Sequence, residues 1–449
     1  MLDDLAPLTA RLLDAARKAG AAEADAMAVR AVAQSVDVRG RALEQAERAD
    51  AVEIGLRVLL NGRQACVSAS QHDDTTIAEM AARAVAMARE APLDDNLGLA
   101  DPAQIVPSGS MAEALELADD APEPAPEALR DMALRAEAAA LDHPGISQVE
   151  SAGAAATRRW MWLAGTNGLS AGYGRSGYSL STVAITGEGL AMERDWAGES
   201  RVWLSDMPAP EDIGRLAAER TLARAGARKP PTGAVPILYD ERIAAGLIGH
   251  VLAAVSGTAV ARGASWLRDA LGQQVLPAGM DLREDPHLPR YGASRPFDAE
   301  GLPTAPRDII RDGVVQGWTL DLATGRRLGM ASTASAARSA GGVPAPVVSN
   351  VVLTPGHASR AELIRDMGRG LLVTSMLGAS INPTTGDYSR GAAGFWVENG
   401  EIAYPVNECT IAGNLREMMA TLIAANDARD WRSHRVPSLL VEGLTVAGA

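Results

Sequence analysis

Aromatic residues are scarce in this sequence, at 4% of its 449 residues. Alanine, valine and leucine must therefore supply most of the packing in any hydrophobic core. Hydrophobic residues of all types still make up 47% and charged residues 22%, which is close to the average of globular proteins and favours a folded chain over a disordered one. The length exceeds that of one ordinary core, so we expect two or three domains.

Cysteine occurs twice, as Cys66 and Cys409. Two cysteines so far apart in the sequence form neither the disulfide framework of a small secreted protein nor a zinc cluster of the CxxC kind. The sequence has no uncharged apolar run of about 18 residues, so we expect no membrane-spanning helix. Near its start it carries Asp3 and Asp4, where a secretory signal peptide would carry lysine or arginine. A cytoplasmic protein is the simplest expectation.

Basic residues are outnumbered by acidic ones, 42 to 56, which gives a formal net charge of −14. A surface that binds nucleic acid or an anionic membrane needs a positive field to offset the phosphates. We therefore expect neither partner, whereas a basic or neutral peptide remains compatible with this charge.

The first 91 residues predict an N-terminal α/β block with a helix at each end. Asn61-Gly62 is a typical type I′ hairpin turn, and residues 76–79 (TIAE) resemble a capping box that opens the second helix. Alternating apolar and polar residues predict strands at residues 27–39, 52–60 and 64–70.

The next two segments are a connector and a second block. Residues 92–126 contain six prolines and predict a connector with one short helix. Residues 127–226 repeat the arrangement of helices and hairpins, with another hairpin turn at Asn167-Gly168.

A linker over residues 227–233 (ARKPPTG) leads into a third region, residues 234–449. This region predicts a strand over 235–239, a helix over 241–256 and a β-rich C-terminal domain. Because helices and antiparallel hairpins are segregated rather than alternating as βαβ units, the predicted fold class is α+β.

Neither a nucleotide-binding loop nor the nucleophile turn of a serine hydrolase is indicated by the sequence. It contains no GxxxxGK[ST] loop and no GxSxG turn. The segment 172–177 (GYGRSG) lies inside a predicted strand block, where bends or bulges explain glycine better than phosphate binding does.

One histidine stands out among six. His250 lies in residues 243–252 (IAAGLIGHVL), an apolar segment that predicts a helix. A lone histidine on such a face is more often a hydrogen-bonded core residue than a metal ligand.

Three segments carry a family resemblance. They are residues 243–275, which end in SWLRDALGQQV, residues 382–400 (NPTTGDYSRGAAGFWVENG) and residues 404–415 (YPVNECTIAGNL). They resemble the TldD/PmbA family of bacterial and archaeal metallopeptidases, which includes proteins called modulators of DNA gyrase. The resemblance spans nearly the whole chain and is strongest to the PmbA branch, also called TldE.

The resemblance implies a specific loss of zinc chemistry. In the TldD branch the helix carries His-Glu-x-x-x-His, in which the imidazoles bind zinc and the glutamate activates water. Here Ala245 replaces the first histidine, Gly246 replaces the glutamate, and only His250 matches. A third ligand, a cysteine in the family, is expected within residues 424–428 (AANDA), which contain none. We therefore expect no catalytic residue, no metal ligand set and no cofactor in this chain, and His250 is interpreted as structural or a relic.

Two other features have functional interpretations. Cys409 could in principle join a Cys–His peptidase site, but the sequence around it favours a small buried residue. The polar segment between two predicted apolar strands is either a solvated hairpin loop or a loop that lines a cleft or contacts a partner. The candidate residues of that loop are Asn382, Thr385, Asp387, Tyr388, Ser389 and Arg390.

The resemblance also implies an assembly. In the family, TldD-type and PmbA-type chains form a heterodimer around a cleft, and the zinc-bearing chain cuts unfolded peptides, including leader peptides. By that analogy this chain is a non-catalytic subunit that completes the cleft for an extended peptide, with zinc in the TldD-type partner. The alternatives are a peptidase active by itself as a homodimer, and a regulatory module that binds gyrase or another protein without proteolysis.

Overall fold

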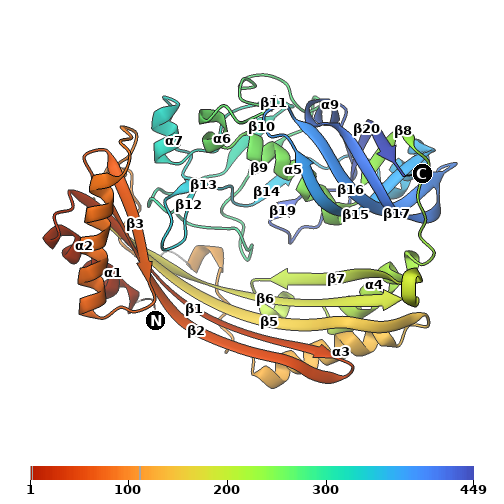
Figure 1. Ribbon diagram of the computed structural model, residues 1–449, viewed down its shortest axis with the longest axis horizontal. Coiled ribbons are helices and arrows are strands. Elements are labelled where there is room, and N and C mark those ends of the chain that lie inside the picture. The colour runs from red at the N-terminus through yellow and green to blue at the C-terminus, as the bar shows by residue number, and fades with distance from the viewer. Residues whose placement is uncertain (1, 3, 111–112, 449) are drawn as a thin grey trace.

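The computed structural model describes residues 2, 4–110 and 113–448. The remaining residues of the predicted N-terminal block, connector and C-terminal domain (1, 3, 111, 112 and 449) lie outside the described residues. The N-terminal half forms one long, curved sheet along one side of the molecule, and the C-terminal half lies across it (Figure 1).

The long sheet has the strand order β3-β2-β1-β5-β6, and β6 also pairs with β4 and β7. Neighbouring strands are antiparallel except β4 and β6, which are parallel. The strands are β1 (Glu23–Arg39), β2 (Ala42–Leu60), β3 (Arg63–Ala69), β4 (Gly109–Ser110), β5 (Ile146–Gly165), β6 (Ser170–Thr186) and β7 (Glu193–Arg201).

The sheet is built from two copies of one arrangement: a helix, three strands and a second helix. The repeated pattern predicted from the sequence is therefore confirmed, and the strands that begin each copy, β1 and β5, pair with each other. The boundaries proposed at residues 91, 126 and 226 stay predictions, because the two blocks share a single sheet. The helices are α1 (Leu5–Lys18) and α2 (Asp74–Glu90), then α3 (Pro126–Leu141) and α4 (Pro210–Ala223).

Local sequence signals explain the turns, with one correction at a helix start. Asn61 and Gly62 have φ of 50° and 71°, as a type I′ turn requires. The capping box predicted at residues 76–79 is wrong. Helix α2 begins three residues earlier, because the side chain of Asp73 accepts a hydrogen bond from the backbone N–H of Thr76 (3.0 Å).

The glycine-rich part of β6 contains no β-bulge, so the predicted bulges are wrong there. The register between β5 and β6 is continuous from residue 170 to residue 182. A Cβ atom at Gly172 would lie 2.4 Å from the ring of Trp162, and one at Gly174 would lie 2.9 Å from the ring of Trp160. The glycines leave room for two tryptophans on the neighbouring strand.

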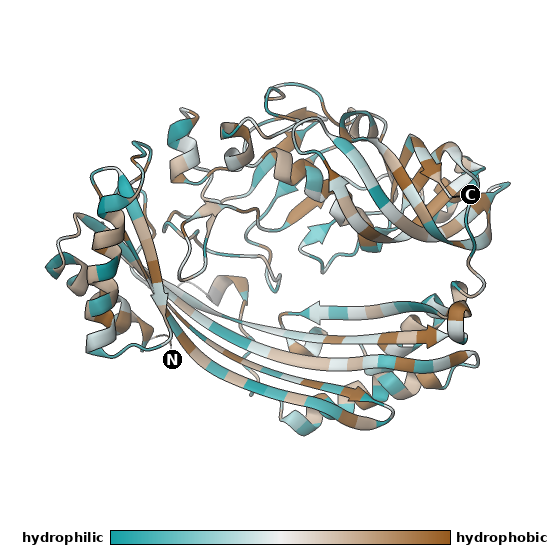
Figure 2. Ribbon diagram, in the orientation of Figure 1, coloured by the Kyte–Doolittle hydropathy of each residue, from teal (hydrophilic) through white to brown (hydrophobic). Residues whose placement is uncertain are grey.

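Each face of the sheet is covered by a different part of the protein. The four helices cover one face, on which Trp162 of β5 and Tyr178 of β6 are buried. Met161 and Tyr173 have the opposite parity and pack with Phe297 of the C-terminal half. Polar and apolar residues are accordingly interspersed along the long strands (Figure 2).

The C-terminal half is β-rich, as predicted, and contains the largest buried core. A six-stranded sheet has the order β17-β16-β15-β8-β20-β18, and an additional pairing of β17 with β20 closes it on itself. Its strands are β8 (Gly233–Tyr239), β15 (Gly370–Ile381), β16 (Asp387–Glu398), β17 (Glu401–Asn414), β18 (Ile423–Ala424) and β20 (Leu439–Ala447).

A smaller sheet and five helices complete the described part of this half. The sheet consists of β9 (Leu282–Glu284), β10 (Arg307–Arg311), β11 (Val314–Val315), β14 (Val351–Leu353) and β19 (His434–Arg435), and a separate pair is β12 (Ala336–Ala337) and β13 (Ala345–Pro346). The helices are α5 (Glu241–Ala254), α6 (Gly257–Ala261), α7 (Leu322–Arg327), α8 (Arg360–Met367) and α9 (Leu415–Ala420). The α+β class is thus confirmed. In the described part of the chain no helix is both long and apolar enough to cross a membrane.

Candidate functional site

Helix α5 carries the residues that the sequence singled out. It begins directly after the buried strand β8, and the side chain of Asp240 caps it by accepting from the N–H of Arg242 (3.2 Å). Ala244, Leu247 and Val251 recur at helical spacing and are fully buried in the C-terminal core. The helix is therefore fixed along one side, while the opposite side carries small residues.

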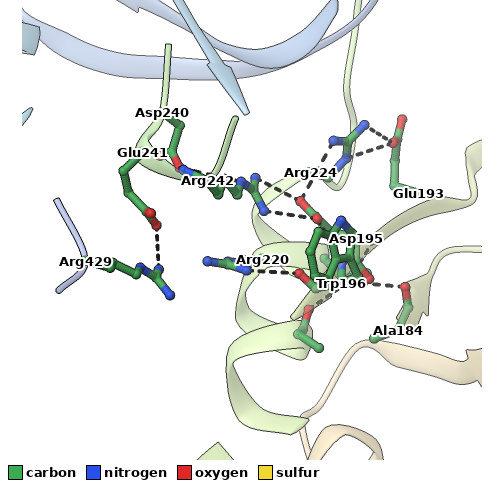
Figure 3. A network of polar contacts seen from close by, with 12 residues as sticks. Ala184, Glu193, Asp195, Trp196, Arg220, Arg224, Asp240, Glu241, Arg242 and Arg429 are labelled. Atoms are coloured by element: carbon green, nitrogen blue, oxygen red, sulfur yellow. Dashed lines mark hydrogen bonds and ion pairs between the residues drawn. The ribbon is translucent and has the colours of Figure 1, made fainter. Parts of the chain in front are cut away.

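A network of ion pairs fixes the start of α5 against the N-terminal sheet (Figure 3). The guanidinium of Arg242 donates two parallel hydrogen bonds to Asp195 of β7, each 3.1 Å long. Arg429 bridges Glu199 of β7 (2.9 Å) and Glu241 of α5 (2.5 Å). The Arg242 and Asp195 side chains are 7% and 5% exposed. These buried charges connect the two halves of the molecule at the base of α5.

The three motif positions lie on α5 with different surroundings. Ala245 is half-buried and packs against the C-terminal core. Gly246 is exposed, and a Cβ atom there would meet no other atom within 4 Å. His250 is half-buried, one turn further along. There is thus room for a larger side chain at Gly246, and the absence of one is a feature of the sequence rather than a demand of packing.

The ring of His250 packs against β16, a contact that sequence reasoning did not predict. Its centroid lies 5.8 Å from that of Tyr388, edge to face. Burial, assisted by the positive charge of Arg390, lowers the pKa of His250 below its usual value. Its Nε2 is buried without a hydrogen-bond partner among the described residues, so the expected hydrogen-bonded core histidine is wrong in that respect.

The groups around His250 do not fit a zinc site. A catalytic zinc takes three protein ligands, and the neighbours that the structure gives His250 are a phenol and a guanidinium. Both carboxylate oxygens of Asp427, the one ionisable residue in the segment where the third ligand is expected, accept hydrogen bonds from Ser438. Across residues 2, 4–110 and 113–448, no three histidine, cysteine or acidic side chains lie close enough together to hold a metal ion.

Cys409 is a buried core residue, as predicted. It is 5% exposed, and its Sγ donates to the backbone carbonyl of Ala392 (3.2 Å). Burial raises the pKa of the thiol to about 11, so the nucleophilic thiolate is disfavoured at neutral pH. The side chain therefore lacks the activation that a Cys–His peptidase requires.

The candidate loop divides between a hairpin tip and a strand. Asn382 and Thr385 lie in the exposed turn between β15 and β16, where the Asn382 side chain accepts from the N–H of Thr385 (3.3 Å). Asp387, Tyr388, Ser389 and Arg390 belong to β16. Tyr388 is buried and donates to the sulfur of Met376 (3.3 Å). The structure thus brings Tyr388 and Arg390 to His250, and a role for the exposed tip in partner binding stays a prediction.

A cleft between the sheet and the C-terminal half was not predicted. It has a volume of about 750 Å³ and lies between strands β5, β6 and β7 and the segments 290–292 and 431–433. Trp196 and Trp431 line it and are 50% and 43% exposed. The cleft combines segments far apart in the sequence, which explains why periodicity did not reveal it. Exposure of Trp196 and Trp431 is a property of the fold, so the sequence alone did not mark them as cleft residues.

Similarity to known proteins identifies the family. The chain matches models of the PmbA/TldA metallopeptidase domain 1 over residues 24–88, its central domain over 119–225 and its C-terminal domain over 232–448. The chain belongs to the PmbA/TldD metallopeptidase family. The family expected from the sequence is thereby confirmed.

Relatives match along almost the whole chain. Metalloprotease PmbA of Escherichia coli O157:H7 is 35% identical over 416 residues, which cover 92% of this chain and 90% of that protein. A PmbA homolog of Haemophilus influenzae is also 35% identical, over 97% of this chain and 94% of that protein. Members of both branches are related to this chain, since a TldD homolog of H. influenzae is 24% identical over 48% of it and 45% of that protein.

Solved structures share the fold. A protein named as a modulator of DNA gyrase from Bacteroides thetaiotaomicron matches with a TM-score of 0.90 and 26% identity, over 99% of this chain and 98% of that one. TldE from Thermococcus kodakarensis matches with a TM-score of 0.84 and 19% identity, over 98% and 99%, which supports the fold alone.

Proposed function

We propose that this chain is a non-catalytic subunit of a PmbA/TldD-type peptidase assembly. It completes the substrate cleft for a TldD-type partner, and that partner carries the zinc and cuts unfolded or leader peptides. The observation that carries the proposal is the composition of helix α5, which presents one imidazole beside a phenol and a guanidinium, with alanine and glycine at the other two motif positions.

The chemistry of these side chains supports a loss of hydrolytic activity. Metal-assisted peptide hydrolysis needs a held Lewis acid and a base that removes a proton from water. Neither Ala245 nor Gly246 has a group that binds a metal or accepts a proton. The positive charge of Arg390, which already disfavours protonation of His250, also opposes a divalent cation there.

The cleft supports a role in holding substrate. Its volume of about 750 Å³ falls in the range of ~300–1,000 Å³ that ligand pockets occupy. It is lined along one side by backbone and side chains of β6 and β7, and an extended peptide is the ligand class that lies most readily along strands. The family's metallopeptidase activity makes a peptide the expected occupant.

Metal content and activity of the purified chain test the proposal. We expect less than stoichiometric zinc and no cleavage of an unfolded peptide by the chain alone, and cleavage once a TldD-type chain from the same cell is added. Activity of the isolated chain that survives chelation and disappears in Cys409→Ala would overturn it. A stable complex with gyrase, without any effect on proteolysis by the TldD-type chain, would also contradict it.

A further inference from the structure

A second cavity adjoins the cleft and differs from it in charge. It has a volume of about 260 Å³ and lies between strands β5 and β6 and C-terminal segments near residues 293–299, 336–338 and 347–348. The two cavities are neighbours, because consecutive residues line one and then the other, at Arg175 and Ser176 and again at Gly292 and Ala293. A peptide held in the cleft therefore lies next to this second cavity, which we call the arginine pocket.

Four arginines line the arginine pocket in a protein whose formal net charge is −14. Two of them, Arg159 of β5 and Arg175 of β6, are direct cross-strand partners on the face of the sheet that the C-terminal half covers. Arg295 and Arg338 come from the C-terminal half. Like charges directly opposite each other destabilise a sheet, so this arrangement carries a cost that an anion between them would offset.

Two of these arginines are held in place by backbone carbonyls. Arg175 donates to the carbonyls of Gly292 and Ser294, the latter at 2.6 Å, and its guanidinium lies 5.6 Å from the ring centroid of Tyr173. Arg295 donates to the carbonyl of Val347 (2.5 Å). These contacts fix the guanidinium groups before any ligand arrives, which lowers the entropy lost on binding.

Donor capacity remains in the pocket. Arg159 is exposed and forms no hydrogen bond or ion pair within the described part of the chain. The Nε of Arg295 is buried and has no hydrogen-bond partner among the described residues. Arg338 is 1% exposed and forms an ion pair with Asp25 through Nη1 (2.6 Å), while its Nε and Nη2 are buried without a hydrogen-bond partner among the described residues.

The one carboxylate that lines the pocket is held in place by backbone hydrogen bonds. Asp298 accepts backbone hydrogen bonds from Glu300 (2.9 Å) and Leu302 (3.0 Å) through Oδ1, and from Ala336 (3.0 Å) through Oδ2. It is 1% exposed and cannot turn toward Arg159 without breaking these bonds. The wall between the charged groups is apolar and includes Phe297.

We propose that the arginine pocket binds a carboxylate of the peptide held in the adjoining cleft, and this inference rests on the proposed role of the cleft. A planar guanidinium matches a carboxylate through two parallel hydrogen bonds. The volume of about 260 Å³ is below the ~300 Å³ at which sites for cofactor-sized ligands begin, and it suits one side chain or a chain end. The carboxylate is supplied by an acidic side chain or by the peptide's C-terminus.

Calorimetric titration of the full chain with three short unstructured peptides tests the proposal. The first has capped ends and one glutamate, the second has glutamine in its place, and the third has glutamine and a free C-terminal carboxylate. We expect the first or third peptide to bind more tightly than the second, and added NaCl to reduce that difference. Which of the two peptides gains affinity identifies the source of the carboxylate. Equal affinity of all three would overturn the proposal.

Arg159→Gln is the matched variant, because this side chain has no partner to lose. The variant loses a hydrogen bond to a charged group at an exposed position. We expect its affinity for the acidic peptide to fall about five- to tenfold and its affinity for the neutral peptide to stay unchanged. The control is Arg283→Gln, an exposed arginine on β9 outside the pocket. An unchanged affinity for the acidic peptide in Arg159→Gln would contradict the proposal, provided that both variants unfold at the native temperature.

These outcomes are separate from those of the proposed function. Cleavage of the neutral peptide by the two-chain mixture depends on cleft and partner, and not on the pocket. If the mixture cleaves the neutral peptide but this chain binds all three peptides equally, only the proposal for the arginine pocket is rejected. Binding that prefers carboxylate, in a chain that has no effect on the partner's cleavage, rejects the proposed subunit role instead.

Discussion

At the scale of single residues, the carboxyl group of Glu300 links stability to pH. It is 6% exposed and accepts a hydrogen bond from the N–H of Leu322 (2.8 Å). Burial, followed by the nearby Asp298 carboxylate, raises the pKa of Glu300 to about 8, against the opposing charge of Arg57. The folded protein thus retains a proton that the unfolded chain releases near its usual pKa of ~4.3.

The sign of the resulting pH dependence follows from this difference. The contribution of Glu300 to the free energy of unfolding is complete below the unfolded pKa and falls as pH rises toward about 8. Glu300→Gln keeps an oxygen that accepts from Leu322 and removes the titration. We expect its advantage in urea unfolding to grow as pH rises through this window and to level off above it. The exposed control Glu219→Gln should show no such trend, and a constant difference for Glu300→Gln would contradict the assignment.

The sequence predicted the identity of the motif residues but not their surroundings. Ala245, Gly246 and His250 follow from a pattern within one helix, so a linear comparison was enough. The contact of His250 with Tyr388 could not be predicted, because the two residues lie on elements separated by more than 130 positions and the closed sheet brings them together. The same is true of Arg390, whose positive charge adds to the lack of zinc ligands around His250.

At the scale of elements, helix α5 contains a glycine that lowers its stability and can be replaced. Gly246 lies in the helix interior, is exposed, and has open space where a Cβ atom would be. Because glycine costs a helix about 0.5–1 kcal/mol relative to alanine, Gly246→Ala should raise the free energy of unfolding by about that amount. Chemical denaturation of the purified variant measures it.

A glycine in another helix provides the control for this prediction. In α4, a Cβ atom at Gly214 would lie 2.0 Å from the backbone oxygen of Ala136, so Gly214→Ala should be strongly destabilising. A loss of stability in Gly246→Ala would mean that this face of α5 is covered, contrary to the structure.

The ion pairs at the base of α5 give a second prediction at this scale. Arg242→Ala removes two hydrogen bonds from the buried Asp195 carboxylate and leaves it a longer ion pair with Arg224 (3.9 Å), and breaking a buried pair typically costs about 3–5 kcal/mol. Arg194→Ala on β7, the strand of Asp195, breaks an exposed ion pair with Glu150 and should cost about 1 kcal/mol or less, because the Arg194 side chain is 70% exposed. Thermal or urea unfolding compares the two. Similar losses in both variants would show that the network of Figure 3 does not connect the two halves.

Element boundaries were predictable where turns specify them and not elsewhere. Asn61-Gly62 and Asn167-Gly168 both lie at hairpin turns, as expected. Strand β2 begins at Ala42 rather than near residue 52. Its start was not predicted, because its first residues are exposed and show no alternation of polarity. These residues are in the strand because they pair with β1, and the sequence of β2 alone does not predict that pairing.

At the scale of the whole molecule, the two cavities form only where the N-terminal and C-terminal halves come together. The cleft and the arginine pocket are both lined by strands of the N-terminal sheet and by segments of the C-terminal half. In the sequence, Arg159 and Arg175 are ordinary polar positions of two strands. They form a cationic pocket because they are cross-strand partners and because Arg295 of the C-terminal half lines the same cavity. Net charge gave no warning of it, since a sum over the chain hides a local cluster.

The central claim is that catalysis in the assembly belongs to the partner. The most direct test is the rate of peptide cleavage by this chain mixed with a TldD-type partner, measured for two single changes. Replacing a histidine of the partner's His-Glu-x-x-x-His motif should abolish cleavage, whereas His250→Ala in this chain should leave the rate nearly unchanged. Cleavage that survives the change in the partner and is lost in His250→Ala would contradict the account.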